Sequence, residues 1–153
     1  MPTELRDADG REIRERGQEY GTTTGRPRRC GWFDGVMARF SARLNGFTNI
    51  ALTKFDILDT FPTVKICMAY KLDGTLLEHP PANPALLERC EPVYKELPGW
   101  QKPTGKIRRF EELPSEAQRY VRCLEEILDC PVSLISVGPS REQTIIREPS
   151  TLA

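Results

Sequence analysis

The spacing of apolar residues predicts an amphipathic helix between Trp32 and Gly46. Apolar side chains recur there at three- and four-residue intervals, at Val36, Met37, Phe40 and Leu44. Asp34 stands where a carboxylate can cap the first turn, and Gly46 lies just past the last apolar position, as is typical of a helix C-terminus. The start and stop signals therefore agree with the periodicity.

A second apolar stripe follows Pro114. Its members are Ala117, Tyr120, Val121, Leu124, Ile127 and Leu128. Ser115 and Gln118 have the spacing of a capping box, and Pro131 cannot continue a helix. We expect a helix that opens at Ser115 and stops before Pro131.

Four apolar or β-branched runs predict strands. They cover residues 50–52, 64–70, 132–137 and 144–147. Asp73 and Gly74 mark a turn, and the segments HPPANP (79–84) and ELPGWQKPTG (96–105) predict loops. Helices that alternate with strands favour an α/β fold. At most four strands are expected, and several of them are too apolar to be exposed. We therefore expect a sheet that is flanked by helices and is incomplete by itself.

Charged residues dominate the first 20 positions, where apolar residues show little periodicity. Such a segment buries too little apolar surface to order itself. We therefore expect a connecting arm or frayed end, with residues 1–14 as an arm or linker and residues 15–153 as the domain itself. A chain of 153 residues is long enough for one domain with its own core.

Composition narrows the possible partners. The 22 lysines and arginines balance 22 aspartates and glutamates, so no global charge points to nucleic acid or membrane. No apolar run approaches the roughly 20 residues that span a bilayer, and the polar N-terminus predicts neither a signal peptide nor an anchor. Five cysteines without a CxxC pair fit a reducing cytoplasm. The single histidine, His79, lacks a partner at zinc-ligand spacing and is expected to face solvent from its loop.

The segment GTTTGRPRRCGW (21–32) is rich in hydrogen-bond donors. Backbone N–H groups of a glycine-bracketed turn can form an anion-binding nest, and three threonine hydroxyls add neutral donors. Arginine binds a carboxylate or phosphate through two parallel hydrogen bonds, so Arg26, Arg28 and Arg29 suit a small dianion. The alternative is a solvated basic turn ahead of a helix. An RNA-contacting turn would rest on RPRR alone, and the neutral net charge and lack of interleaved aromatic residues argue against it.

A second candidate is the segment Lys54-Phe55-Asp56, which follows a predicted buried strand. In an open α/β sheet, ligands bind where strands end. A carboxylate there can accept hydrogen bonds from N1–H and the 2-amino group of guanine, whereas adenine presents an acceptor at N1. The stem of Lys54 could lie along the base while its ammonium stays in water. The alternative is an ordinary surface turn.

The third candidate, Ser136-Val137-Gly138, is again the end of a predicted strand. Its backbone N–H groups could approach a purine carbonyl closely because Gly138 has no side chain. A plain strand-ending turn is the alternative.

Four segments taken together resemble the C-terminal part of adenylosuccinate synthetase. They are GQEYGTTTGRPRRCGW, ALTKFDILD, CEPVYKELPGW and ISVGPSREQTI, in this order and at this spacing. The resemblance covers residues 15 to 148. It implies a fold similar to the phosphate-loop GTPases, a homodimer and a magnesium ion. That family joins L-aspartate to IMP with GTP: the purine 6-oxygen is phosphorylated, and the aspartate amino group displaces the phosphate to give adenylosuccinate for AMP biosynthesis.

The resemblance also implies roles for individual residues. An aspartate loop would be formed by Thr22, Thr23, Thr24, Gly25, Arg26, Pro27 and Arg28. Within it, Arg26 would also reach IMP and Arg28 the guanine nucleotide. The remaining GTP-binding residues would be Lys54, Phe55, Asp56, Ser136, Val137 and Gly138. The threonine-arginine loop and the acidic tip at Asp56 are then expected to meet in space.

Three parts of the family have no counterpart in this sequence: the glycine-rich phosphate loop, the general-base aspartate that meets magnesium, and the general-acid histidine. His79 lies in the wrong region to replace that histidine. We therefore expect no catalytic residue and no metal ligand here. The resemblance covers the last third of the family's usual length, which predicts a cytoplasmic fragment or truncated product that is inactive alone. The alternative is a non-catalytic fragment that binds guanine nucleotide or aspartate.

Overall fold

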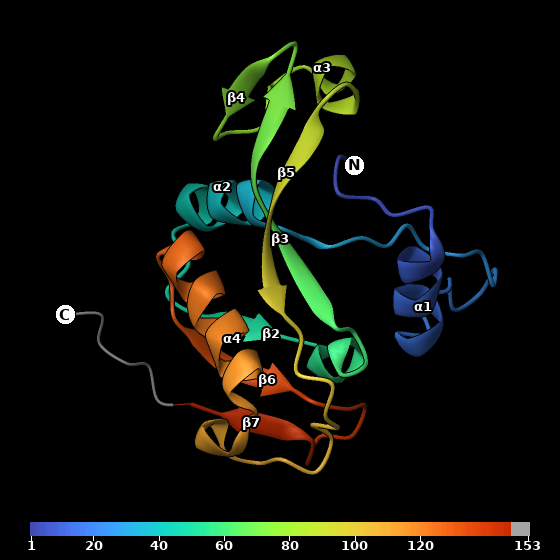
Figure 1. Cartoon of the computed structure of the whole chain (residues 1–153), viewed down its shortest axis with the longest axis vertical. Coiled ribbons are helices and arrows are strands. Elements are labelled where there is room, and N and C mark those ends of the chain that lie inside the picture. The colour runs from blue at the N-terminus through green and yellow to red at the C-terminus, as the bar shows by residue number, and fades with distance from the viewer. Residues whose placement is uncertain (148–153) are drawn as a thin grey trace. The chain divides into compact units, whose positions relative to one another are not determined.

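The computed structural model describes residues 1–147. The chain divides into two compact units, residues 1–37 with 65–96 and residues 38–64 with 97 onward. In chain order the elements are α1 (Ala8–Arg16), β1 (Phe33–Asp34), α2 (Gly35–Asn45), β2 (Ile50–Leu52), the 3-10 helix η1 (Phe55–Leu58), β3 (Thr63–Leu72), β4 (Thr75–Leu77), α3 (Pro84–Glu88), β5 (Glu91–Pro98), the 3-10 helix η2 (Phe110–Glu112), α4 (Ser115–Leu128), β6 (Val132–Ser136) and β7 (Thr144–Ile146) (Figure 1).

The sheet of the first unit is built around β3. β1 pairs with β3 in parallel, with Phe33 opposite Ile66, and β4 pairs with it in antiparallel fashion. β5 is a further neighbour of β3. One buried cluster of this unit comprises Val36, Cys67, Tyr70 and Cys90, against which Leu72, Leu77, Leu87 and Tyr94 pack.

Asp34 joins the start of α2 to this core. Its carboxylate accepts a hydrogen bond from the Met37 amide at 3.1 Å and from the Tyr70 hydroxyl at 2.7 and 2.8 Å. The predicted capping role of Asp34 is thereby confirmed. Gly46, at φ +62°, follows the last residue of α2, as its sequence position predicted.

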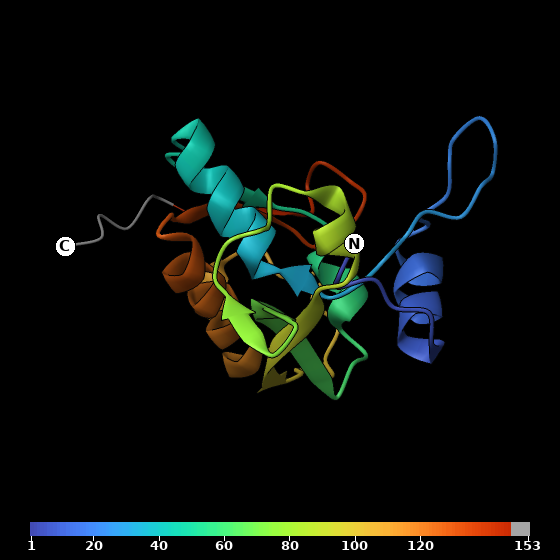
Figure 2. The same cartoon turned by 90° about the horizontal axis from the view of Figure 1, so that it is seen from above.

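The second unit contains the sheet β2-β6-β7. β2 and β6 run in parallel, while β7 returns antiparallel to β6 with Ile145 opposite Ile135. Both isoleucines are fully buried, and α4 lies along one face of these strands (Figures 1 and 2). The α4 stripe that the sequence predicted is buried in full. The fold is therefore α/β, with sheets flanked by helices, as expected.

One row of side chains on this sheet is exposed. Ala51 lies opposite Leu134, and Leu134 lies opposite Ile146. Leu134 is 38% exposed and Ile146 is 77% exposed. A sheet that contains parallel strands is normally covered on both faces. This row is the part of the sheet that its own unit leaves open.

The N-terminal segment differs from the prediction, because an arm was expected and α1 forms. Asp7 caps the helix by accepting from the Gly10 amide at 3.0 Å, and Ile13 is buried. The cap and one anchored apolar side chain stabilise a segment whose low apolar content suggested disorder. The predicted boundary between residues 14 and 15 falls inside this helix.

Three strands and a second helix, besides α1, were not predicted. The described residues form seven strands, and β1, β4, β5 and α3 are additional to the expected elements. The predicted loop 96–105 was wrong at its start, since β5 continues to Pro98. The sequence of β5 shows no clear alternation of apolar and polar residues, because charged residues lie on both faces and two prolines interrupt it. Only its pairing with β3 identifies it as a strand.

The predicted capping box was also wrong. Pro114, not Ser115, occupies the cap position of α4, and Ser115 is already helical. The side-chain nitrogen Nε2 of Gln118 instead donates to the carbonyl oxygens of Leu113 at 2.9 Å and Glu111 at 3.2 Å. Proline's fixed φ suits this entry to the helix without a side-chain cap.

Candidate functional site

The turn that follows β2 displays two polar side chains around a buried aromatic one. Lys54 has φ +56°, the left-handed conformation, and its side chain is exposed. Phe55 is only 1% exposed, whereas Asp56 is half-buried. The buried ring anchors the turn, so that the residues on either side of it are held at the surface.

The Phe55 ring packs in an aromatic cluster. It stacks on Trp100 with ring centroids 4.7 Å apart and planes 11° from parallel, and it lies 6.2 Å from Tyr120. Phe55 was predicted as part of a guanine site. Because its ring lies in the core, any contact of Phe55 with a ligand would be made by its backbone.

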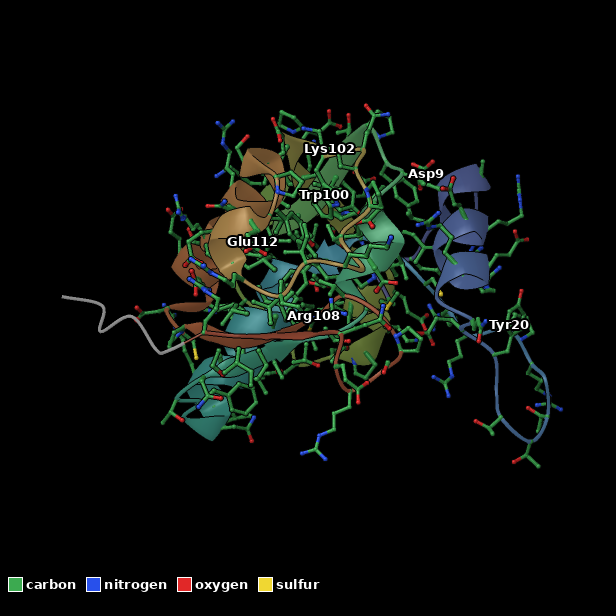
Figure 3. All side chains as sticks on the ribbon, turned by 90° about the horizontal axis from the view of Figure 1, so that it is seen from below. Asp9, Tyr20, Trp100, Lys102, Arg108 and Glu112 are labelled. Carbon is green, nitrogen blue, oxygen red and sulfur yellow. The ribbon has the colours of Figure 1, made fainter. Side chains whose placement is uncertain are left out.

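Asp59, one turn further on, accepts hydrogen bonds from a neighbouring loop. Its carboxylate accepts from the Trp100 indole N–H at 2.6 Å, the Thr104 amide at 2.7 Å and the Thr104 hydroxyl at 3.0 Å. All three residues are buried. The loop 99–105 is thus attached to the segment that carries Lys54 and Asp56. Figure 3 shows Trp100 among the packed side chains and Lys102 at the periphery.

The segment 136–138 is attached to the same loop. The Val137 amide donates to the Gln143 carbonyl oxygen at 2.8 Å, and the Gln143 side-chain amide donates to the Gly105 carbonyl oxygen at 3.1 Å. The Ser136 hydroxyl donates to the Gly138 carbonyl oxygen at 2.9 Å. A side chain at position 138 would collide with the end of Gln143.

The structure therefore connects two of the predicted segments, 54–56 and 136–138, through a loop that sequence reasoning left without a role. The connecting residues are Asp59, Trp100, Thr104 and Gln143. Trp100 and Asp59 lie within motifs that carry the family resemblance, but nothing in their spacing indicates that they contact each other.

The threonine-arginine loop lies in the first unit and folds back on itself. Tyr20 and Pro27 form an antiparallel bridge. The Gly21 amide donates to the Arg26 carbonyl oxygen at 2.8 Å, and Gly25, at φ +63°, makes the turn. Glycine tolerates this conformation without strain. The side chains of residues 22–24 and of Arg26 are exposed at the tip, which Figure 3 shows beyond Tyr20.

The arginines of this loop differ in their contacts. Arg28 donates through Nη1 to Glu19 at 3.0 Å, and its carbonyl oxygen accepts from Arg14 Nε at 2.9 Å. Arg29 donates through Nε and Nη2 to Glu4 at 2.7 and 2.6 Å. That hydrogen bond lowers the pKa of the Glu4 carboxyl and raises the pKa of Arg29. Arg29 is therefore engaged by Glu4, and Arg26 presents its guanidinium at the tip.

The remaining candidates for metal binding or covalent linkage are the histidine, the cysteines and the acidic side chains. Residues 1–147 contain no group of three or more histidine, cysteine, aspartate and glutamate side chains that could hold a metal ion. His79 is exposed, as predicted. The five cysteines are buried and free of disulfide bonds. Within the same described range, no helix has the length and apolar character that crossing a bilayer requires.

These features define an α/β protein with two sets of polar loops: an arginine-bearing tip in one unit, and an acidic turn joined to a glycine turn in the other. Comparison with known proteins specifies the family. The family model described as adenylosuccinate synthetase matches residues 1–145. The chain belongs to the adenylosuccinate synthetase family.

Individual relatives indicate the same family as the family model. The chain is 54% identical over 150 residues to the adenylosuccinate synthetase of Geobacter metallireducens, and 54% identical over 152 residues to that of Thermomicrobium roseum. These matches cover 97% and 99% of this chain but 35% of each relative. A solved structure of fully ligated adenylosuccinate synthetase from Plasmodium falciparum superposes with a TM-score of 0.92 at 38% identity, over 97% of this chain and 36% of that one. The chain thus spans about a third of the length of the curated relatives it matches.

Proposed function

We propose that this chain is the C-terminal part of an adenylosuccinate synthetase and supplies its guanine and aspartate sites. The complete enzyme would use GTP to ligate IMP and L-aspartate to adenylosuccinate, in AMP biosynthesis. In this proposal the chain contributes binding groups and no catalytic residue. The observation that carries the proposal is the connection of segments 54–56 and 136–138 through loop 99–105, because it brings the candidate guanine-binding residues of two distant motifs onto one support.

The guanine site would depend on Asp56. Its carboxylate would accept hydrogen bonds from N1–H and the 2-amino group of guanine. Adenine has neither of these donors, so the carboxylate would lose both hydrogen bonds. A matched pair of hydrogen bonds of this kind can discriminate by about 10⁴-fold. Lys54 would lie along the base, while Ser136, Val137 and Gly138 would close on it from the other side. The buried Phe55 ring supports this arrangement because it holds Lys54 and Asp56 at the surface.

The aspartate site would be the tip of the loop 21–28. Aspartate carries two carboxylates, which suit the threonine hydroxyls and the guanidinium of Arg26. Arg28 carries five N–H donors and uses one for Glu19, so further donors are available to a ligand. Arg26 would also reach IMP, and Arg28 the guanine nucleotide.

Magnesium and a homodimer belong to the proposal for the complete enzyme. Because residues 1–147 contain no suitable cluster of ligands, the described part of this chain does not fit a magnesium site. The metal ligands would come from the part of the family's chain that has no counterpart here.

Reconstitution tests the proposal. The chain is mixed with the part of the Geobacter metallireducens relative that it lacks, together with GTP, IMP, aspartate and magnesium. Adenylosuccinate is the expected product, and its absence from a folded, assembled complex would contradict the proposal. In the same assay, Asp56→Asn should weaken the use of GTP relative to XTP, because an amide cannot accept from both guanine donors. An unchanged base preference would remove Asp56 from this role.

A non-catalytic binding fragment is distinguished by calorimetry on the chain alone. Binding of GDP or aspartate without product formation in the reconstituted mixture would favour that alternative.

A further inference from the structure

Asp59 is a buried carboxylate whose hydrogen bonds come from neutral groups. Its Oδ1 accepts from the Trp100 indole at 2.6 Å and its Oδ2 from the Thr104 amide at 2.7 Å, and the Thr104 hydroxyl lies 3.0 and 3.2 Å from the two oxygens. Asp59 is 9% exposed, Trp100 3% and Thr104 0%. A buried carboxylate is costly unless its lone pairs are satisfied, so these donors fix the loop to Asp59 in one arrangement.

The loop is also fixed at its start. The Gly99 amide donates to the Pro62 carbonyl oxygen at 2.8 Å, and a Cβ at position 99 would collide with the carbonyl oxygen of Phe61. The backbone of loop 99–105 therefore packs directly on the segment that follows η1. This close approach leaves the loop little freedom to shift relative to Asp59.

Trp100 holds the turn around Asp56 at two points. Its ring stacks on Phe55, the residue before Asp56, and its N–H bonds to Asp59, three residues after Asp56. The Asp59 amide in turn donates to the Asp56 carbonyl oxygen at 3.2 Å. The backbone of Asp56 is thus fixed by contacts of the residue before it, Phe55, and of a residue after it, Asp59.

The far end of the loop reaches the second candidate segment. Thr104 is bonded to Asp59, and the adjacent Gly105 accepts from Gln143, whose own carbonyl oxygen accepts from the Val137 amide. A displacement of Thr104 would therefore be transmitted to the backbone of Val137.

We propose that Asp59 is a positioning residue for guanine recognition. It would hold Asp56 directly, and Ser136–Gly138 through Thr104, Gly105 and Gln143, in their binding geometry before the ligand arrives. Preorganisation of this kind improves affinity because the ligand need not order the site. The inference rests on the proposed function, since it assigns Asp59 a role in the same guanine site.

The test measures binding of GDP, XDP and ADP to the whole 153-residue chain by calorimetry, together with amide hydrogen exchange in residues 54–59. Asp59→Asn places an amide N–H₂ against the donors of Trp100 and Thr104. We expect GDP affinity to fall by about tenfold to a hundredfold, the usual scale for misplaced binding groups. Exchange at residues 54–59 should accelerate. Trp100→Phe, which keeps a ring for stacking but removes the N–H, should act in the same direction and replaces Asp59→Asn if that variant does not fold.

A double substitution separates positioning from general destabilisation. If Asp59 acts through Asp56, the loss caused by Asp59→Asn should shrink strongly in an Asp56→Asn background. An equal loss in both backgrounds would overturn the positioning role, as would unchanged exchange at residues 54–59. Asp73→Asn is the matched control, because it makes the same change at an exposed aspartate of the first unit that pairs with Arg89, and it should bind GDP like the unmodified chain.

Failure of the proposed function has its own signature. If the unmodified chain binds GDP no better than ADP, the guanine site itself is refuted, and the role of Asp59 falls with it. If the unmodified chain prefers GDP and Asp59→Asn leaves that affinity unchanged, only the role of Asp59 is refuted.

Discussion

The rings of Phe55 and Trp100 stack with their centroids 4.7 Å apart, although 45 positions of sequence separate the two residues. The stack joins the turn that carries Lys54 and Asp56 to the loop that Asp59 holds. It explains why an aromatic residue lies between two polar ones at the end of a strand. The Phe55 ring is a structural anchor that holds its polar neighbours, Lys54 and Asp56, at the surface.

Truncation of this anchor should destabilise the protein. Phe55→Ala removes a fully buried ring and should lower the free energy of unfolding by about 3–5 kcal/mol. Phe55→Leu should cost less, because much of the volume remains. Denaturant unfolding followed by Trp fluorescence provides the measurement. Phe40→Ala is the control: Phe40 is 40% exposed, so its loss should change stability by only about 0.5 kcal/mol. Equal effects of the two alanine variants would contradict the anchoring role.

Gly99 should not tolerate a side chain. Gly99→Ala would place a methyl group against the Phe61 carbonyl oxygen, a backbone atom that cannot rotate away. The expected loss is about 1–3 kcal/mol of stability, as for other overpacked positions. Gly105→Ala in the same loop is the control, since its nearest atom would lie at an ordinary 3.4 Å. Thermal melts of the two variants compare them directly, and a Gly99→Ala melt like that of Gly105→Ala would refute the clash.

Alkaline pH should destabilise the first unit through Cys67. Burial, assisted by the negative charge of Asp34, raises the pKa of the Cys67 thiol to about 12 from an ordinary 9.0. Between these values the unfolded chain releases a proton that the folded chain retains, so stability should fall as pH rises from 9 to 12. The slope for one such group is about 1.4 kcal/mol per pH unit. Urea unfolding at several pH values measures it. Cys67→Ala should flatten this slope, and an unaltered slope in that variant would assign the effect to other groups.

The open row Ala51-Leu134-Ile146 should promote self-association of the isolated chain. An uncovered apolar strand face beside a short edge strand is a surface onto which a second copy can pack. Sedimentation velocity should show a concentration-dependent increase in mass, which Ile146→Thr should reduce. Leu76→Thr provides the control, because Leu76 is 64% exposed but lies on β4 of the other unit. A sharp monomeric melt without concentration dependence would contradict this expectation.

Local sequence signals predicted the two long helices well. The apolar stripe of α4, the cap formed by Asp34 and the left-handed Gly46 are each encoded within a few residues, so periodicity and capping chemistry suffice to find them. The stripe of α2 was found in the same way, but Phe40 and Leu44 are 40% and 72% exposed. Periodicity predicts which face of a helix is apolar, and it does not tell whether anything covers that face.

The errors lie where stability comes from distant partners. β5 has polar residues on both sides and became a strand because it pairs with β3. α1 has little apolar periodicity, and besides its local Asp7 cap it depends on the tertiary packing of one buried isoleucine. In both cases tertiary contacts outweigh intrinsic propensity, as they commonly do in short or highly charged elements.

The sequence by itself determined the family of this protein, the α/β class and the candidate binding residues 22–28, 54–56 and 136–138, because residue types and motif order carry that information. Only the tertiary structure decided that Phe55 faces inward, that Arg29 pairs with Glu4, and that Asp59 binds Trp100 and Thr104. Those contacts join residues 25 to 45 positions apart. Such residues come together because burial and hydrogen bonding across the whole unit stabilise the fold. A pattern of a few neighbouring residues contains no information about these long-range contributions.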